Sequence, residues 1–253
     1  MKIVTFNVRC VWSGDGINSF PHRAGGIVSR IGSDRPDVIC FQECTDKIFG
    51  LLQSALPDYT IVFNQRDADR RGEGLATALR RDSVSLLGLE SFWLSPTPNL
   101  PGSRYEEQSS CPRICQCVTA RFGDSLFRVY NIHLDHKSDL ARRLGMEATL
   151  RRVREDLDRD PLPFFILGDF NAKPDSAPIE LCGDNPYAEL TELTADVAGT
   201  FHGFGQLEEP IKIDYIFADP DTAAKAVEVT PWLDEKDGIY LSDHYPVAVC
   251  IEL

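Results

Sequence analysis

Phe164-Phe165-Ile166-Leu167-Gly168-Asp169-Phe170-Asn171 is the stretch of sequence that most strongly constrains the fold. Its first four residues are large and apolar, which predicts a strand buried on both faces. The run then ends abruptly in a glycine, a carboxylate and an amide. Asp169 and Asn171 lie two residues apart, so in extended backbone their side chains point to the same side. A tight turn that uses Asp and Asn for local hydrogen bonds also explains these residues, so the stretch alone predicts a strand end and no function.

Short apolar or alternating runs recur along the whole chain, and each predicts a further strand. Helical spacing of apolar residues is found in only two segments, 23–31 and 138–157. Many strands with few long helices favour two packed β-sheets with helices on the outside. The length of 253 residues permits one large domain or two small ones. The expected strands are 2–8, 38–42, 60–63, 75–79, 84–89, 113–122, 127–134, 164–167, 211–217 and 247–251.

The charge balance bounds the class of partner. The chain has 26 Lys and Arg against 39 Asp and Glu, a formal net charge of −13. Proteins that grip long nucleic acids usually carry a basic surface that displaces counterions from the phosphates. The acidic balance therefore disfavours processive binding to duplex DNA, while a local basic patch or a bound cation leaves a small phosphorylated substrate open.

Neither end of the chain nor its interior shows a membrane or export signal. Met1 leads directly into a strand-like run, without the basic and apolar regions of a signal peptide. No apolar stretch approaches the roughly 20 residues that span a bilayer. We therefore expect a cytoplasmic protein with no membrane partner.

Eight cysteines are spread along the chain, and none forms a Cys-x-x-Cys pair. That spacing disfavours a zinc site. A disulfide framework is not expected in a chain of this size without an export signal. We interpret the cysteines as reduced and mostly buried thiols.

Two stretches place ionisable side chains where a strand begins or runs. Ser242-Asp243-His244 precedes the apolar run 245–251, and there an Asp–His pair offers a carboxylate for a metal and an imidazole for phosphate oxygens. Asp214 interrupts the apolar strand 211–217, so it needs a partner, such as an imidazole that it orients. Taken alone, Asp243 and His244 are better explained as an ordinary surface pair.

The stretch 129–136, Val-Tyr-Asn-Ile-His-Leu-Asp-His, alternates polar and apolar residues. In a strand this alternation puts Asn131, His133 and Asp135 on one face. Polar side chains along a mostly buried strand require hydrogen-bond partners. A satisfied structural network explains the pattern as well as a functional site does.

Two further strands close on a side-chain oxygen, Thr5-Phe6-Asn7 and Phe41-Gln42-Glu43. Together with the stretches above, the candidate groups are all oxygen or imidazole donors. Hard oxygen ligands in small number favour Mg²⁺, or Mn²⁺ in its place, with water and substrate phosphate completing the shell. One shared site is a simpler explanation than six independent turns that happen to carry such residues.

The ordered motifs TFN, QE, NIHLDH, GDFN, IDYIF and SDHYPV resemble those of the endonuclease/exonuclease/phosphatase superfamily. That group includes pancreatic deoxyribonuclease, abasic-site endonucleases, neutral sphingomyelinases, inositol polyphosphate phosphatases and deadenylases. The resemblance runs from residue 3 to about 251, which implies a single domain over residues 1–253. It implies an α/β fold, a four-layer sandwich of two packed mixed β-sheets flanked by helices. Gly72-Glu73, the segment 92–98, Cys111-Pro112-Arg113 and the segment 200–204 are similar to a bacterial branch related to the deadenylases.

The resemblance also implies a role for each motif residue. Glu43 is the expected main metal ligand, helped by Asn7 and Asp243. Asp169 is expected to deprotonate the attacking water, and His244 to stabilise charge on the phosphate. The remaining expected roles are positioning by Asn171, orientation of His244 by Asp214, a phosphate contact near the leaving group by His133, and substrate binding by Arg113, Asp135 and Arg142.

We therefore expect a Mg²⁺-dependent phosphoester hydrolase. The first candidate is a phosphodiesterase or nuclease acting on short or single-stranded nucleic acid or on nucleotide conjugates. The second is a phosphatase or phosphodiesterase acting on a small sugar or lipid phosphate, and the third is a non-catalytic phosphate-binding module. Membership of a superfamily does not decide among them. Specificity is expected to lie in the loops 12–20, 64–74, 93–112 and 199–210.

Overall fold

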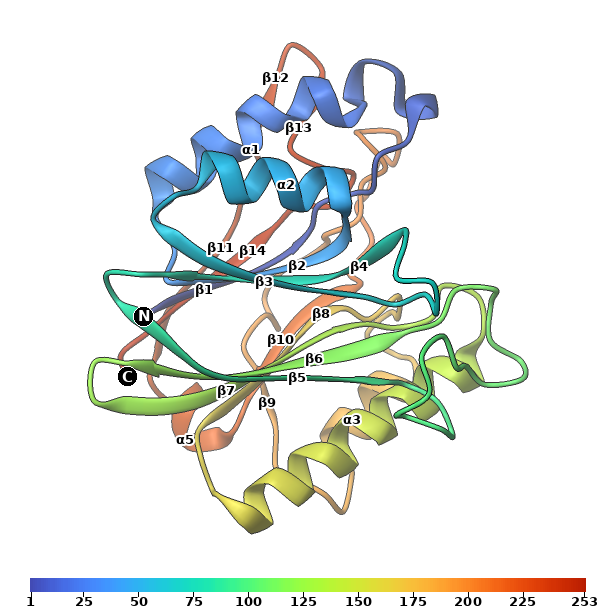
Figure 1. The fold of residues 1–253 in the computed structure, drawn as a ribbon, viewed down its shortest axis with the longest axis vertical. Helices are drawn as coiled ribbons and strands as arrows, with labels where there is room; N and C mark the ends of the chain where they lie inside the picture. Colours follow the sequence, from blue (N-terminus) through green and yellow to red (C-terminus); the bar gives the residue numbers. More distant parts are fainter.

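Two six-stranded β-sheets face each other in the computed structural model, which describes all 253 residues (Figure 1). The first sheet has the strand order β11-β14-β1-β2-β4-β3, and the second has the order β5-β6-β7-β8-β10-β9. A short hairpin, β12-β13, stands apart from both. The strands are β1 (Lys2–Asn7), β2 (Val38–Thr45), β3 (Tyr59–Gln65), β4 (Glu73–Arg80), β5 (Val84–Trp93), β6 (Ile114–Phe122), β7 (Ser125–His133), β8 (Phe164–Asp169), β9 (Thr191–Glu192), β10 (Asp214–Ala218), β11 (Ala226–Pro231), β12 (Glu235–Lys236), β13 (Ile239–Tyr240) and β14 (Val247–Ile251).

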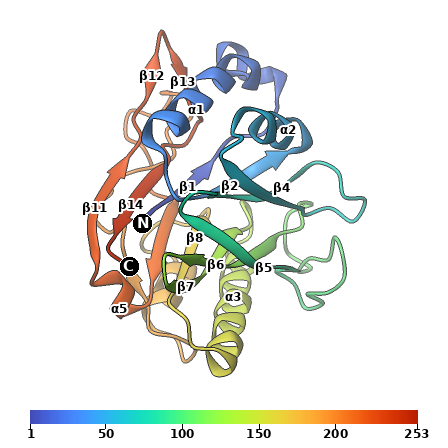
Figure 2. The same ribbon diagram turned by 60° about the vertical axis from the view of Figure 1, so that its left-hand side comes forward.

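Helices cover the outer face of each sheet, which gives four layers (Figures 1 and 2). α1 (Phe20–Asp34) and α2 (Asp46–Ala55) lie on the first sheet, and α3 (Asp139–Arg159) lies on the second beside α4 (Ala177–Gly183). A 3-10 helix, η1 (Ser13–Asn18), and a short α5 (Pro220–Ala223) complete the helical elements. The predicted four-layer sandwich of two mixed sheets is confirmed, and no helix has the length and apolar character required of a membrane span.

Three separate apolar cores correspond to the three interfaces between the four layers. One lies between the first sheet and α1 and α2, one between the second sheet and α3 and α4, and the third between the sheets. In β8, Phe164 and Ile166 enter the core under α3, while Phe165 and Leu167 enter the core between the sheets. Burying each such side chain stabilises the fold by about 1.5–3 kcal/mol. The continuous apolar run arises because both faces of this central strand are covered.

Most predicted strands are present, with shifted ends. The strand expected at 113–122 begins one residue later, at Ile114, and the strand expected at 211–217 begins only at Asp214. Arg113 and Ile211 therefore lie in the connecting segments. α2 and α4 were not predicted.

The topology brings one set of strand ends together. β1 runs parallel to β2, and β7 runs parallel to β8. β14 and β10 run antiparallel to β1 and β8, so they begin where β1 and β8 end. The motif residues that close β1, β2, β7 and β8 thus meet the residues that open β10 and β14. In Figure 1 this end of the sheets lies away from the two termini.

Candidate active site

The two sheets are joined across this end by the side chain of Asn7. Its Nδ2 donates a hydrogen bond to Asp169 Oδ2 at 2.9 Å and another to Glu43 Oε1 at 3.2 Å. Asn7 and Glu43 belong to the first sheet and Asp169 to the second. The bond from Asn7 to Asp169 joins residues 162 positions apart in the sequence, and the expected convergence of these strand ends is present.

Asp169 is a buried carboxylate with two distinct oxygens. Oδ1 accepts the backbone N–H of Asn171 at 2.8 Å, which is a local turn, and Oδ2 accepts from Asn7. Burial, and next the negative charge of Asp214, raise the pKa of Asp169 to about 7. A carboxylate with a pKa near neutrality is well matched to take a proton from water.

The backbone on either side of Asp169 is specialised. Gly168 has φ of +146°, and a Cβ there would lie 1.9 Å from the carbonyl oxygen of Ile132 on the neighbouring strand. Only glycine fits so close an approach. Asn171 has φ of 49°, a left-handed conformation that asparagine tolerates better than most residues, and its Nδ2 donates to Leu134 O at 3.1 Å. The same residues therefore form a local turn and line the candidate site.

The imidazole of His244 is held by Asp214 and also lies near Asp169. Its Nδ1 lies 2.8 Å from Asp214 Oδ2, and its Nε2 lies 3.9 Å from Asp169 Oδ2. Burial by itself lowers the pKa of His244, but the charge of Asp214 and its hydrogen bond outweigh burial and raise the pKa to about 10. His244 is therefore a cationic donor at neutral pH, with Nε2 as the donor that remains free of Asp214.

His133, in contrast, is neutral at pH 7, because its surroundings lower its pKa. Burial, and next the positive charge of Arg113, hold the pKa of His133 well below its ordinary value. Its Nε2 lies 3.3 Å from Asp169 Oδ2. The site therefore places one cationic imidazole, that of His244, and one neutral imidazole, that of His133, near the carboxylate of Asp169.

Glu43 reaches the site through an irregularity in β2. The pairing of β2 with β4 shifts register between Phe41 and Cys44, and Glu43 has φ of 57°. Bulges of this kind redirect a side chain at the end of a strand. Glu43 Oε2 accepts the backbone N–H of Cys10 at 2.9 Å. Burial opposes ionisation of Glu43, but that hydrogen bond, the charges of His244 and Arg9 and the hydrogen bond from Asn7 together lower its pKa.

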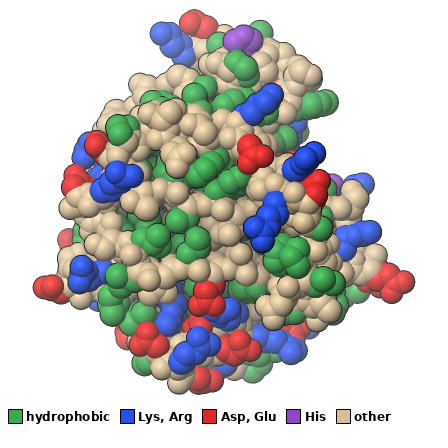
Figure 3. Space-filling view, in the orientation of Figure 1, with side chains coloured by type: hydrophobic (Ala, Val, Ile, Leu, Met, Phe, Trp, Pro, Cys, Tyr) green, Lys and Arg blue, Asp and Glu red, His purple; other side chains and the backbone are tan.

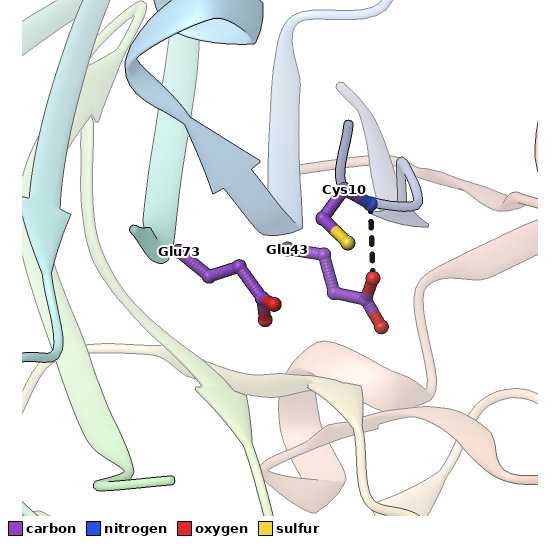
Figure 4. A group of neighbouring side chains, drawn as sticks. All are labelled: Cys10, Glu43 and Glu73. Atoms are coloured by element: carbon purple, nitrogen blue, oxygen red, sulfur yellow. Dashed lines mark hydrogen bonds between the residues drawn. The ribbon is translucent and has the colours of Figure 1, made fainter. Parts of the chain in front are cut away.

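The residues around Glu43 suit a divalent cation. Glu43 forms no ion pair with a basic side chain, and Glu73 and the Cys10 thiol lie close by, all three offering ligand atoms within 4.8 Å of one another (Figure 4). Burial, and next the charge of Glu43, raise the pKa of Glu73. Like charges held this close favour a bound cation, and the carboxylate oxygens are hard donors. Asp243 Oδ2 lies 3.6 Å from Arg9 Nη1 and faces the same pocket.

These groups line a pocket of about 340 Å³. Asn7 and Asp214 do not line it, but seven other residues predicted from the sequence do: Glu43, Arg113, His133, Asp169, Asn171, Asp243 and His244. Sequence reasoning gave no role to Arg9, Arg66 or His136, and it noted Glu73 only as part of a family motif. The lining residues are Arg9, Cys10, Glu43, Arg66, Glu73, Cys111, Arg113, His133, His136, Asp169, Asn171, Phe201, Ile213, Asp243 and His244.

Two candidates for substrate binding lie outside this wall. Asp135 accepts the backbone N–H groups of Lys137 and Ser138 at 3.0 and 2.8 Å, and it also accepts from Ser109. Arg142 donates to the carbonyl oxygen of Asp135 at 2.9 Å and pairs with Asp139. Both side chains are thus engaged in fastening the turn that leads into α3, and the structure does not bring them to the substrate pocket.

A family model and several known proteins are similar to this chain. The family model described as "Endonuclease/Exonuclease/phosphatase family" matches residues 4–244. An endonuclease/exonuclease/phosphatase from Bacteroides vulgatus is 26% identical, with a TM-score of 0.89 over 99% of this chain and 98% of that one. Two more distant structures share the fold. The mannosyl-6-phosphatase Bt3783 of Bacteroides thetaiotaomicron is 23% identical over 100% of both chains, with a TM-score of 0.88.

The other is D. rerio TDP2 complexed with a single strand DNA product, which is 19% identical over 98% of this chain and 97% of that one, with a TM-score of 0.72. An uncharacterized protein, L388, of Acanthamoeba polyphaga mimivirus is 22% identical over 223 residues, which cover 79% of this chain and 80% of that protein. The family match spans nearly the whole chain and includes every motif residue of the pocket. The chain therefore belongs to the endonuclease/exonuclease/phosphatase family, whose members are metal-dependent phosphoester hydrolases.

Proposed function

We propose that this protein hydrolyses a small phosphoester with Mg²⁺, for which Mn²⁺ substitutes, and with Asp169 as the general base. The single observation that carries the proposal is the Asn7 amide, which bonds both the base and Glu43. It fixes the proton acceptor and the metal ligand at a set separation in one pocket. Glu43, with Asn7 and Asp243, would hold the cation.

The residues divide the reaction as follows. A water molecule beside Asp169 gives a proton to the carboxylate while its oxygen forms a bond to phosphorus. The ester P–O bond breaks in line, and the leaving oxygen takes up a proton from solvent. His244 Nε2 donates to a non-bridging oxygen and stabilises its growing charge. When bound, Mg²⁺ supplies further charge neutralisation at the phosphoryl group.

Three further residues support Asp169, His244 and the cation. Asp214 keeps His244 protonated and oriented through the 2.8 Å contact at Nδ1. Asn171, tied to Leu134 O, positions the water or the phosphate on the far side of the turn. Neutral His133 supports Asp169 at 3.3 Å and offers a phosphate contact near the leaving group.

The size of the pocket and the mixed charge of the visible surface support a small substrate such as a phosphorylated sugar or a nucleotide. A volume of about 340 Å³ accommodates a compact ligand. On the face shown in Figure 3, acidic and basic side chains are interspersed, without the continuous basic stripe that tracks a nucleic-acid backbone. Bt3783, which has the same fold over its full length, is named as a mannosyl-6-phosphatase.

A second candidate is the end of a short or single-stranded nucleic acid. Trp12 is 56% exposed and lies against Arg9, with the guanidinium carbon 5.4 Å from the ring centroid, and Arg9 lines the pocket. An exposed indole at the rim can stack on a base. The DNA-bound D. rerio TDP2, which has the same fold, supports this candidate as well.

The test is a substrate panel with Mg²⁺: phosphorylated sugars, mononucleotides, dinucleotides, single-stranded RNA and DNA, and lipid phosphates. Every assay is paired with Asp169→Asn. Turnover of a small phosphoester that the variant loses supports the proposal, and turnover of only the oligonucleotides selects the second candidate. If no member of the panel is turned over faster by the wild type than by the variant, the protein is a binding module and the proposal is wrong.

A further inference from the structure

One basic side chain in the pocket, that of Arg113, has no ion-pair partner. Arg113 is 4% exposed, and its Nη2 lies 3.2 Å from His136 Nδ1. Its Nε and Nη1 are buried without any hydrogen-bond partner, and it forms no ion pair. Burying a guanidinium costs several kcal/mol unless charge and hydrogen bonds compensate. Burial lowers the pKa of Arg113, and the charges of Asp169 and Glu73 offset that effect only in part.

The neighbouring arginines are ion-paired or bound to carbonyl oxygens, although Arg66 Nε is also buried without a hydrogen-bond partner. Arg66 pairs with Glu73 at 2.8 Å, and Arg9 pairs with Asp15 and faces Asp243. Arg23, which is 1% exposed, donates to four backbone carbonyl oxygens. Arg113 thus differs from Arg9, Arg23 and Arg66 in combining two buried donor nitrogens without a partner with the lack of an ion pair.

Arg113 also borders the reacting groups. It lines the same pocket as Asp169 and His133, and it lines a narrower recess with His133 and Arg66. Burial, and next the charge of Arg66, lower the pKa of Arg113, so an anion that enters here removes a real penalty. Because Arg66 is already paired, Arg113 is the arginine left to bind that anion.

We propose that Arg113 binds the phosphoryl group that is hydrolysed and makes the site selective for a terminal phosphomonoester over a phosphodiester. This inference rests on the proposed function. A monoester dianion has three non-bridging oxygens, whereas a diester has two. The cation and His244 account for two oxygens, and the free Nη1–H donors of the Arg113 guanidinium suit the third. In a diester that position carries an esterified oxygen, which has less charge and brings a substituent toward a buried wall.

The discriminating experiment compares 4-nitrophenyl phosphate with bis(4-nitrophenyl) phosphate, which share one leaving group. With Mg²⁺, the wild type should favour the monoester at least about tenfold in kcat/KM. Arg113→Met should lower monoester kcat/KM by about 10²-fold or more, the range for losing a charged donor to the phosphoryl oxygens, and change the diester value by less than about threefold. Arg113→Lys should retain only part of the monoester activity, because an ammonium lacks the fixed donor directions of the planar guanidinium.

The matched control is Arg128→Met. Arg128 is also buried, at 8% exposed, but it pairs with Asp160 at 3.1 Å and lies outside the pocket. Its loss should lower the unfolding temperature and leave the monoester-to-diester ratio unchanged. Arg113→Met should leave the unfolding temperature unchanged or raise it, because it removes an uncompensated charge.

A binding readout separates this inference from the proposed function. Inorganic phosphate with Mg²⁺ should bind the wild type and Asp169→Asn alike and bind Arg113→Met at least about tenfold more weakly, by calorimetry. Equal losses for monoester and diester, a wild type that prefers the diester, or undiminished phosphate binding by Arg113→Met would each overturn the role of Arg113. Absence of turnover with both substrates, while phosphate binding still depends on Arg113, would instead refute the proposed function.

Discussion

The side-chain amide of Asn7, at the end of β1, donates to the carboxylate of Asp169, at the end of β8, at 2.9 Å. This bond joins the two sheets at the point where the proposed base lies. Each sheet alone contributes an incomplete site, since Glu43 is on the first and Asp169 on the second. Activity therefore requires the two sheets to be aligned, and substitutions at the interface between them should alter the position of Asp169.

Removing this bond should disturb both activity and its pH dependence. The hydrogen bond from Asn7 favours the ionised form of Asp169, so Asn7→Ala should raise the pKa of Asp169 further above its ordinary value. The acid limb of kcat/KM should then move to higher pH, and the rate at neutral pH should fall by roughly 10–10²-fold. A pH profile from 5 to 9 with saturating Mg²⁺ measures both, and an unmoved acid limb would contradict the assignment of Asp169 as base.

Asp169→Asn should abolish the base and preserve the structure. The rate should fall by roughly 10²–10⁴-fold, the contribution expected of a general base. Burial raises the pKa of Asp169 to about 7, so its ionised form is disfavoured by the fold, and the neutral amide should leave the unfolding temperature unchanged or higher. Kinetics and thermal unfolding of the same preparation check both statements, and a destabilised variant would show that the carboxylate is mainly structural.

Asp214→Asn should make activity sensitive to alkaline pH. In the wild type the pKa of His244 is raised to about 10, so the imidazole stays protonated through neutral pH. Without the charge of Asp214, burial would dominate and lower that pKa, so activity should decline as pH rises from about 6 to 9, whereas the wild-type rate should rise to a plateau as Asp169 ionises. His244→Ala sets the lower limit, with a loss of about 10²–10³-fold at all pH values. Parallel profiles for wild type and Asp214→Asn would refute the proposed role of the pair.

Chelation should remove activity reversibly. EDTA should abolish turnover, and Mg²⁺ or Mn²⁺ should restore it, whereas Zn²⁺ alone should not, since the donors are hard oxygens. Glu43→Gln should raise the Mg²⁺ concentration at half-maximal activity at least about tenfold. Cation binding followed by calorimetry provides a check that does not depend on turnover, and an unchanged Mg²⁺ requirement would mean that Glu43 is not the main ligand.

Gly168→Ala should destabilise the protein although it touches no substrate. The added Cβ would lie 1.9 Å from Ile132 O, so neighbouring backbone must move, at a cost of at least about 2 kcal/mol. Gly50→Ala in α2 is the matched control, because a Cβ there meets nothing within 4 Å, and alanine favours helix by about 1 kcal/mol. Denaturant unfolding of both variants should give changes of opposite sign.

The sequence predicted the sandwich because strand patterns in its centre are unambiguous. Phe164–Leu167 is apolar at every position, and the structure buries both faces of it. α2 (Asp46–Ala55) escaped prediction because it is short and contains Gly50, so its apolar pair Ile48 and Leu52 is a weak signal. Its beginning is set by Thr45, whose side chain accepts the N–H of Ile48, a local cap that periodicity does not report.

The site was predicted where residues sit at strand ends and missed where they sit in loops. Asn7, Glu43, Asp169 and His244 are tied to strands whose order places them together, so their motifs suffice. The positions of Arg9, Arg66 and His136 depend on loop conformation, which a single sequence does not specify. Asp135 was misassigned because its alternation with His133 suggested a shared face, whereas the chain turns there and the carboxylate binds backbone N–H groups.

His133, Asp169 and Asp214 are direct register partners on three adjacent strands, with Asp169 in the middle. Their separations are thus set by hydrogen-bonded strand spacing, about 4.8 Å per step, and not by any loop. Mutations that lengthen, shorten or replace the loops around the pocket can change what enters without altering the distances among these three groups. During evolution, the sheet would therefore preserve the reaction, while substitutions in the surrounding loops could change the substrate.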